Sequence, residues 1–188
     1  VEARSLNERF EMHEEAVRAV IEDPLESKAR GKDQKKEKKA KRKAIKQALK
    51  AEDDGQPQRP RIFVLDFDGD MQASQVDQLR EEVSAILPVV GEADKVLLRL
   101  ESGGGVVHGY GLAASQLMRF KDAGITLTIS VDKVAASGGY MMACVGDEII
   151  AAPFAILGSI GVVAQLPNFH RLLKKKDIDF EMHTAGEY

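Results

Sequence analysis

The residue of this sequence that is best placed to do chemistry is Ser137, in the stretch VDKVAASGGYMMA. An extended β-branched run leads up to it, an apolar helix-like segment follows it, and its neighbours within two residues are all alanine or glycine. A serine at a strand-to-helix turn lifts its hydroxyl out of the sheet, and the N–H group of the next residue, Gly138, then points to where an oxyanion would form. Small neighbours let a substrate backbone come close. The stretch indicates a nucleophilic serine, with a packed small-residue turn as the simpler alternative.

A second candidate is the glycine turn ESGGG, residues 101–105. Three successive glycines between a strand and a helix let the backbone approach a ligand, and N–H groups at a helix start favour negative charge. The Gly-Lys-Ser/Thr of a phosphate loop is absent. Alone, the turn is equally well explained as a plain connection. Parallel neighbouring strands end at one sheet edge, where α/β proteins bind ligands, so we expect this turn to meet the one at Ser137.

A third stretch, FVLDFDGD, resembles the nucleophile loop of haloacid-dehalogenase-type phosphatases. There the first carboxylate, here Asp66, attacks phosphorus, and the second, here Asp68, acts as acid and base beside a magnesium ion. Here Asp70 takes the place of a threonine-like residue, and the later acidic stretch GDE is followed by the strand IIAAP, which has no further carboxylate. A metal would lack ligands, so we interpret the stretch as a strand ending in an Asp-Gly turn.

Short strands and helices alternate from residue 61 onward. Strands are expected at 61–67, 95–100, 125–131 and 148–153, and helices at 74–87 and 108–122. Ser74 is a candidate N-cap of the first helix, and Gly124 is the C-terminal signal of the second. This alternation predicts an α/β architecture with parallel pairing between strands joined by helices.

The N-terminal third differs in composition, and we divide the chain into a charged arm with its linker, residues 1–55, and a folded domain, residues 56–188. The net charge of −3 hides an asymmetry, because residues 31–50 carry ten basic side chains against two acidic ones. We interpret this run as a solvated or juxtamembrane segment. Nucleic-acid binding is disfavoured because no aromatic residues interleave for base stacking. Residues 52–60 have the glycine, proline and charge content of a linker.

Other features bound the protein class. The single cysteine, Cys144, cannot form an intrachain disulfide and is expected to be a small core residue. The longest uncharged run, residues 149–165, is too short for a membrane span and is broken by proline and glycine. The chain starts without methionine or a signal peptide, so we expect a piece of a longer protein with room for an upstream anchor. No metal or cofactor is expected.

Residues 98–169, which contain LRLESGGGVVHGYG, VDKVAASGGYMMA and GSIGV in that order, carry a family resemblance. The chain resembles the signal peptide peptidase A family of bacterial serine peptidases, and most closely its SohB-type members, over roughly residues 61–188. The resemblance implies an α/β fold of the crotonase/Clp-protease type, a spiral of ββα units, here truncated at the C-terminus. It also implies a Ser/Lys catalytic dyad in place of a Ser-His-Asp triad.

The resemblance assigns roles to individual residues. Ser137 matches the nucleophile, Gly105 and Gly138 would supply the two oxyanion N–H groups, Gly103 and Gly104 would line the substrate, and Ser159 matches the serine that holds the base lysine. The family's Ser-Pro-Gly-Gly turn falls on residues 102–105, and Gly103 replaces the proline. The turn should therefore be less rigid here.

The general base is the main departure from the family pattern. The family's lysine follows an aromatic residue about fifty residues after the nucleophile, whereas this chain reads HTAGEY and stops at Tyr188. We expect the lysine just past the end and an inactive fragment. A solvated lysine has a pKa of about 10.4 and is no base. We interpret six other candidates within the chain as structural, solvated or surface residues: Lys133, Lys174, Lys175, Lys176, His170 and His183. His108 lies beside the glycine turn, where it could touch substrate, but no Asp is evidently placed to orient it.

The resemblance implies a serine endopeptidase that cleaves signal peptides or other apolar, membrane-associated peptides. It also implies a homo-oligomer at the bacterial inner membrane, with the catalytic domain on the periplasmic side and no nucleic-acid partner. A lysine run beside a membrane span would instead indicate the cytoplasmic side. Two other classes stay open: a non-catalytic, membrane-tethered scaffold and a crotonase-like acyl-CoA enzyme.

Overall fold

The computed structural model describes residues 1–23 and 60–186, with eight positions between them: 30, 31, 33, 36, 39, 40, 43 and 44. Most of the lysine run, residues 52–59 of the expected linker and the last two residues lie outside the described residues. The expected division of the chain at residues 55 and 56 therefore stays a prediction.

The described residues from 60 onward form a six-stranded sheet around one central strand. The strands are β1 (Ile62–Gly69), β2 (Lys95–Ser102), β3 (Thr126–Val131), β4 (Val134–Ala136), β5 (Glu148–Ala151) and β6 (Ile156–Gly158). Strand β2 pairs with β1 on one side, and with β3 and then β4 on the other. Strand β3 continues to β5 and β4 to β6, and every one of these pairs is parallel. The result is a curled parallel sheet.

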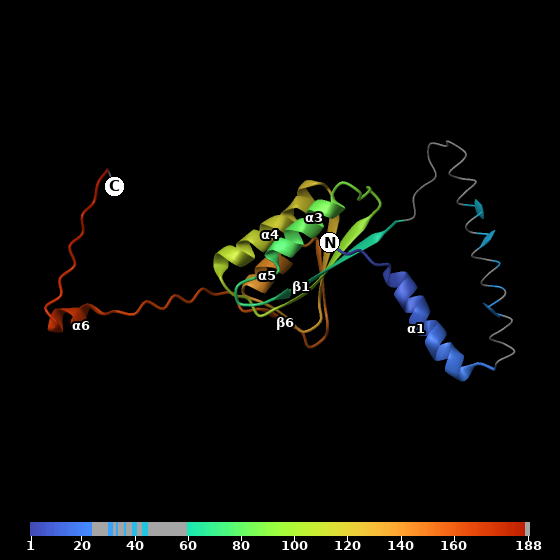
Figure 1. Ribbon diagram of the computed structural model, residues 1–188, viewed down its shortest axis with the longest axis horizontal. Helices are drawn as coiled ribbons and strands as arrows, with labels where there is room; N and C mark the ends of the chain where they lie inside the picture. The colour runs from blue at the N-terminus through green and yellow to red at the C-terminus, as the bar shows by residue number, and fades with distance from the viewer. Residues whose placement is uncertain are drawn as a thin grey trace.

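Three helices cover one face of this sheet: α3 (Val76–Ile86), α4 (Val107–Asp122) and α5 (Gly138–Ala143). Helix α4 packs against both α3 and α5, as Figure 1 shows. Alternate residues of β2 and one stripe of each helix meet in the core, as the periods of strands and helices require. The largest fully buried side chains are Tyr110, Phe67, Phe120, Leu79, Leu98, Leu100, Leu117, Leu127, Ile129, Met142, Val83 and Val96. This α/β arrangement with a curled parallel sheet is that of the crotonase/Clp-type fold, as predicted.

The expected elements differ from the observed ones near the serine. The extended run that leads to Ser137 is two strands, β3 and β4, separated by a bend at Asp132 and Lys133. Strand β6 was not expected at all. Both β4 and β6 have three residues, too few for a period-2 pattern, and they exist because neighbouring strands pair with them.

Two local predictions were wrong. Ser74 is not the N-cap of α3, because Gln75 occupies that position and the Ser74 hydroxyl donates to Asp70 Oδ2 at 2.7 Å. Cys144 is exposed rather than part of the core. It lies at the C-terminal end of α5, where Met142 and Ala143 take the buried positions. The expected end of α4 is confirmed, since Gly124 follows it with a φ of 72°.

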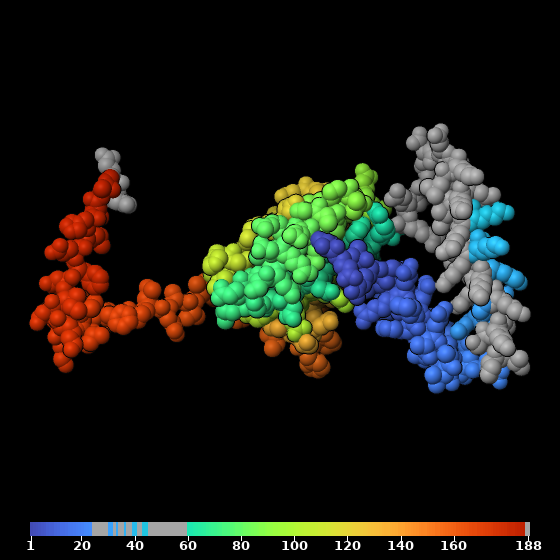
Figure 2. Space-filling model, in the orientation of Figure 1, coloured from blue at the N-terminus to red at the C-terminus, as the bar shows by residue number. Residues whose placement is uncertain are grey.

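Two described segments are not part of the sheet or of the helices that cover it. Helix α1 (Leu6–Ile21) has no buried residue in the described part of the chain, and Ser5 caps it by accepting a hydrogen bond from Glu8 N at 3.3 Å. Residues beyond Gly158 leave the folded body and include the short helix α6 (His170–Lys175), as Figures 1 and 2 show. In the described residues we find no helix with the length and apolar character of a membrane span.

A buried carboxylate joins the starts of β1 and β2. Asp94, 6% exposed, accepts hydrogen bonds from Arg61 N at 2.7 Å, Arg61 Nη2 at 2.6 Å and Gly91 N at 2.8 Å. Lys95 N donates to Arg61 O at 2.9 Å. The Arg61 guanidinium, followed by the backbone N–H donors, holds the pKa of Asp94 well below its ordinary value. The charged form of Asp94 therefore stabilises the folded state.

Acidification tests this carboxylate. A folded-state pKa below the unfolded one, about 3.9, means that the stabilisation is present above that pH and is lost as the pH falls toward the folded value. Asp94→Asn should lower the free energy of unfolding at neutral pH and make it less sensitive to acid, as measured by urea unfolding of the full-length protein. Asp77→Asn, which breaks only an exposed pair with Arg80, is the control. Equal acid sensitivity of wild type and Asp94→Asn would contradict the assignment.

Candidate active site

Ser137 occupies a strained turn between β4 and α5. Its φ of 51° and ψ of −116° lie in a region that non-glycine residues rarely adopt, and such strain costs about 1–3 kcal/mol. Hydrogen bonds hold the turn from both sides: Ser137 N donates to Gly158 O at 2.8 Å, and Met141 N donates to Ser137 O at 3.0 Å. The half-buried serine is thereby fixed at the carboxyl end of β4.

The glycine turn lies directly against this serine turn. Gly104 has a φ of 86°, and a Cβ atom there would lie 2.6 Å from Ser137 Cβ and 2.8 Å from Gly138 N. Real Cβ atoms do not come this close, so only glycine fits. The expected meeting of the two turns is therefore present, and its closest point is Gly104.

Gly105 and Gly138 are each packed against another element. A Cβ atom at Gly105 would overlap the carbonyl oxygen of Met71, which follows β1 and also accepts a hydrogen bond from Val106 N at 2.9 Å. A Cβ atom at buried Gly138 would overlap the ring of Tyr110. Gly103 differs, because it is exposed and nothing lies within 4 Å of where its Cβ would be.

Strand register explains why these turns meet. Gly69 of β1 pairs with Ser102 of β2, and Ser102 pairs with Ala135 of β4. Ala136 pairs in turn with Gly158 of β6. The turns that follow β1, β2, β4 and β6 therefore lie side by side at the carboxyl edge of the sheet, where α/β proteins place their sites.

Ser159 is the first residue after β6 at this edge. It is exposed and has a φ of 53°. Its chain neighbour Gly158 supplies the carbonyl oxygen that accepts the Ser137 N–H. The structure thus brings Ser159 to the same edge as Ser137, one residue from a direct hydrogen-bond partner of the serine turn.

Sequence reasoning missed a buried pair of hydroxyl groups below the turns. Tyr110, on α4, is fully buried, and its hydroxyl lies 2.5 Å from Ser102 Oγ. Tyr110 also donates to Asp70 O at 2.7 Å, and Ser102 Oγ accepts from Gly104 N at 3.0 Å. A signal was present, since Tyr110 lies one helical turn before Ala113 and Ala114 on the apolar stripe of α4, where a tyrosine needs a partner for its hydroxyl.

Lys133 is excluded as a general base by its ion pair. Its Nζ lies 2.9 Å and 3.0 Å from the two carboxylate oxygens of Glu101, on β2. This hydrogen-bonded carboxylate raises the pKa of Lys133, so the ammonium stays protonated at neutral pH. The interpretation of Lys133 as structural agrees with this geometry.

The other candidate bases are exposed. His108 lies in the first turn of α4, and His170 and Lys174 to Lys176 lie in or next to α6. His183 lies further along the same segment and pairs with Glu181 at 3.6 Å. The structure therefore places none of these side chains in a buried position.

Two acidic residues at the end of β1 and just after it have structural partners. Asp66 binds Arg99 through two contacts, at 2.5 Å and 2.6 Å. Asp70 accepts hydrogen bonds from Ser74 and Gln72, which lower its pKa. Among the described residues no group of three His, Cys, Asp or Glu side chains could hold a metal ion. Asp68 and Gly69 are the last two residues of β1 and the turn follows at residues 71 and 72, so the predicted strand end is present but the Asp-Gly pair does not itself form the turn.

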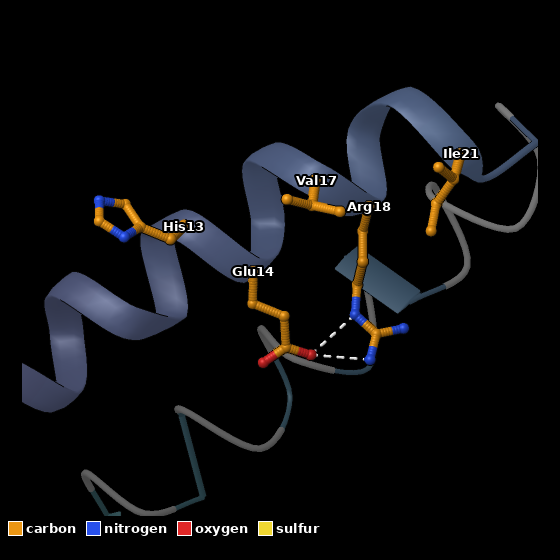
Figure 3. Close-up of a pocket in the computed structure, with 5 residues that line it drawn as sticks. All are labelled: His13, Glu14, Val17, Arg18 and Ile21. Atoms are coloured by element: carbon orange, nitrogen blue, oxygen red, sulfur yellow. Dashed lines mark hydrogen bonds and ion pairs between the residues drawn. The ribbon is translucent and has the colours of Figure 1, made fainter. Parts of the chain in front are cut away.

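A hollow on α1 is unrelated to the serine turn. It is lined by His13, Glu14, Val17, Arg18 and Ile21, all from α1, and Figure 3 shows Glu14 paired with Arg18. That ion pair, at 2.7 Å, joins two side chains one helical turn apart, and both are largely exposed. The hollow offers no nucleophile, so the candidate active site is the sheet edge at Ser137.

The fold and the serine turn define a crotonase/Clp-type α/β protein with a candidate serine nucleophile, and family models agree with this class. The model described as "Peptidase family S49 N-terminal" matches residues 1–117, and that described as "Peptidase family S49" matches residues 119–188. The chain belongs to peptidase family S49. The boundary between the two models falls inside α4, which is one continuous helix.

Curated relatives agree with this assignment. The chain is 68% identical over 130 residues to "Probable protease SohB" of Buchnera aphidicola, and 67% over 127 residues to "Probable protease SohB" of Haemophilus influenzae. These matches cover 69% and 68% of this chain, but only 39% and 36% of those proteins. "Protease 4" of Haemophilus influenzae is 34% identical over 121 residues, 61% of this chain and 20% of that protein. The resemblance to SohB-type proteins is confirmed, and the chain spans about two fifths of the length of the SohB relatives.

The contact at Gly104 makes a testable prediction. Gly104→Ala should lower the free energy of unfolding by about 1–3 kcal/mol, because the new methyl group would meet both Ser137 and Gly138 at a positive φ. Thermal or urea unfolding of the full-length protein measures the effect. Gly111→Ala, within α4 and with nothing within 4 Å of the new Cβ, should be neutral or stabilising. Equal effects of the two substitutions would rule out the close contact of the two turns.

Proposed function

We propose that this chain carries the nucleophile and the oxyanion hole of a serine endopeptidase. The observation that carries the proposal is the strained Ser137 turn, packed directly against Gly104 of the glycine turn at the carboxyl edge of the sheet. A nucleophile on a sharp strand-to-helix turn, with backbone N–H groups beside it, is the arrangement that acyl transfer requires. Membership of peptidase family S49 supports peptide bonds as the substrate.

In the proposed reaction Ser137 Oγ attacks the carbonyl carbon of the scissile peptide bond. The N–H groups of Gly105 and Gly138 stabilise the oxyanion of the tetrahedral intermediate. A base takes the Ser137 proton and returns it to the leaving amine, which departs with the C-terminal part of the peptide. Water then hydrolyses the acyl-enzyme by the reverse proton path.

The proposed base is a lysine of a Ser/Lys dyad, held by Ser159 and located just after Tyr188. Lys133 is unsuited to this role, since its Glu101 partner raises its pKa. A lysine must lose most of its hydration before its pKa falls into the working range. The fragment without that lysine should be inactive, whereas the full-length protein should be active.

The proposed substrates are signal peptides or other apolar, membrane-associated peptides. The small residues around Ser137 support this preference, because they leave room for an extended peptide backbone at the sheet edge. We further propose that the full-length protein is a homo-oligomer, held at the bacterial inner membrane by an upstream anchor with the catalytic domain on the periplasmic side. No cofactor and no nucleic acid take part in the proposed reaction.

The nucleophile is tested by covalent labelling of the full-length protein. A serine-reactive phosphonate should modify Ser137, as mapped by mass spectrometry, and Ser137→Ala should abolish labelling and lower peptidase activity by at least about a thousandfold. A folded wild-type protein that is not labelled at Ser137 would overturn the proposal. Binding of coenzyme A by such a protein would then favour an acyl-CoA enzyme, and its absence a scaffold.

The base is tested by comparing two lysines. Lys133→Met should leave kcat within about twofold of wild type, because it removes only an exposed ion pair with Glu101, which solvent screens. Replacing the lysine expected after Tyr188 by methionine should abolish activity but leave the folded state intact. Loss of activity in Lys133→Met, with retention in the other variant, would reverse the assignment.

A further inference from the structure

Two buried hydroxyl groups, those of Ser102 and Tyr110, form one chain of hydrogen bonds beneath the candidate oxyanion hole. Tyr110 has a single hydroxyl proton, which it donates to Asp70 O at 2.7 Å. Ser102 Oγ lies 2.5 Å from the Tyr110 hydroxyl and also donates to Gly69 O at 3.2 Å. Ser102 Oγ in turn accepts the Gly104 N–H at 3.0 Å. Every hydroxyl proton in this chain has an acceptor.

Burial makes this chain rigid. Ser102 is 2% exposed and Tyr110 is fully buried. Removing the partner of a buried polar group costs free energy, so a network in which every group has a partner favours a single arrangement. Burial also raises the pKa of Tyr110, and the phenol therefore keeps its proton.

Tyr110 is connected to three of the four turns at the sheet edge, to one of them through Ser102. Its hydroxyl binds the turn after β1 at Asp70, and Ser102 connects it to the glycine turn at Gly104. Its ring lies so close to Gly138 of the serine turn that a Cβ atom at this position would overlap the ring. On its other side the ring packs edge-on against Phe67, with centroids 6.3 Å apart and planes at 70°. One side chain therefore connects Gly138, one proposed oxyanion donor, with Gly104, the residue before the other proposed donor, Gly105.

We propose that Tyr110, acting with Ser102, is a positioning residue that sets the separation of the Gly105 and Gly138 N–H groups in the oxyanion hole. This inference rests on the proposed function. An oxyanion hole stabilises the transition state only when both donors lie about 2.7–3.1 Å from the oxyanion. Gly103 does not restrict the backbone as a proline would. The next residue, Gly104, is held by the hydrogen bond from its N–H group to Ser102 Oγ.

Tyr110→Phe isolates the hydroxyl, because the ring remains against Gly138 and Phe67. In the full-length protein, kcat and the rate of Ser137 labelling by a phosphonate should fall about 10- to 100-fold, whereas KM should change less than about threefold. Both rates are divided by the amount of Ser137 that carries the label when the labelling reaction is complete. A residue that only stabilises the fold would lower the amount of active protein and leave these rates unchanged.

Ser102→Ala and the double variant test whether the two hydroxyls act as one chain. Ser102→Ala should lower kcat to a similar extent, and Tyr110→Phe with Ser102→Ala together should lower it no further than the stronger single variant. Matched controls remove hydroxyls elsewhere. Tyr140→Phe, on α5, and Ser115→Ala, whose hydroxyl donates to Gly111 O within α4, should keep wild-type rates.

The outcomes separate the inference from the proposed function. Wild-type labelling at Ser137, with unchanged kcat and labelling rate in Tyr110→Phe and in Ser102→Ala, would overturn the positioning role and keep the peptidase. Absence of wild-type labelling would overturn the proposed function, and the positioning role with it. If Tyr110→Phe does not fold, Ser102→Ala alone decides, again by its rate per labelled site.

Discussion

The geometry of the candidate site depends on the parallel pairing of one three-residue strand. Strand β4 is held between β2 and β6, and the hydrogen bond from Ser137 N to Gly158 O extends that pairing into the turn. Without it, nothing in the serine itself would favour a φ of 51°. Pairing in the sheet therefore offsets the strain of this backbone. The sheet itself is stabilised by burial of the leucine, valine and aromatic side chains of the core.

Close backbone approach is the second constraint, and it explains the small residues. Gly104 lies against Ser137 and Gly138 lies against Tyr110, so each position is closed to a side chain by a different neighbour. Gly103 has open space around it and meets no such limit. Adjacent glycines in one turn thus have unequal roles: Gly104 allows two turns to touch, whereas a side chain at Gly103 would meet no neighbour.

The sequence predicts the larger part of this architecture, because long periodic elements such as β2 and α4 carry their own signals. It also predicts that the turns at Ser137 and at residues 103–105 meet, since parallel strands that are neighbours end together. It does not predict β4 and β6, whose pairing partners lie far along the chain, or the exposure of Cys144, which depends on the rotation of a short helix. Nor does it predict the hydrogen bond of Tyr110 to Asp70, forty residues earlier, because only the folded chain brings them together.

The described residues supply some, but not all, of the groups that the proposed reaction needs. They hold the proposed nucleophile and the proposed backbone donors, but Lys133, near the site, is exposed and ion-paired with Glu101. An ammonium in contact with water or a carboxylate keeps its proton, so a Ser/Lys dyad needs a lysine enclosed by apolar packing. Ser159 lies at an open end of the sheet, beside the exposed residues Ile160 and Val162. A working dyad therefore requires that additional structure bury this end and bring a lysine with it, so the reactivity of Ser137 would arise only when that structure is in place.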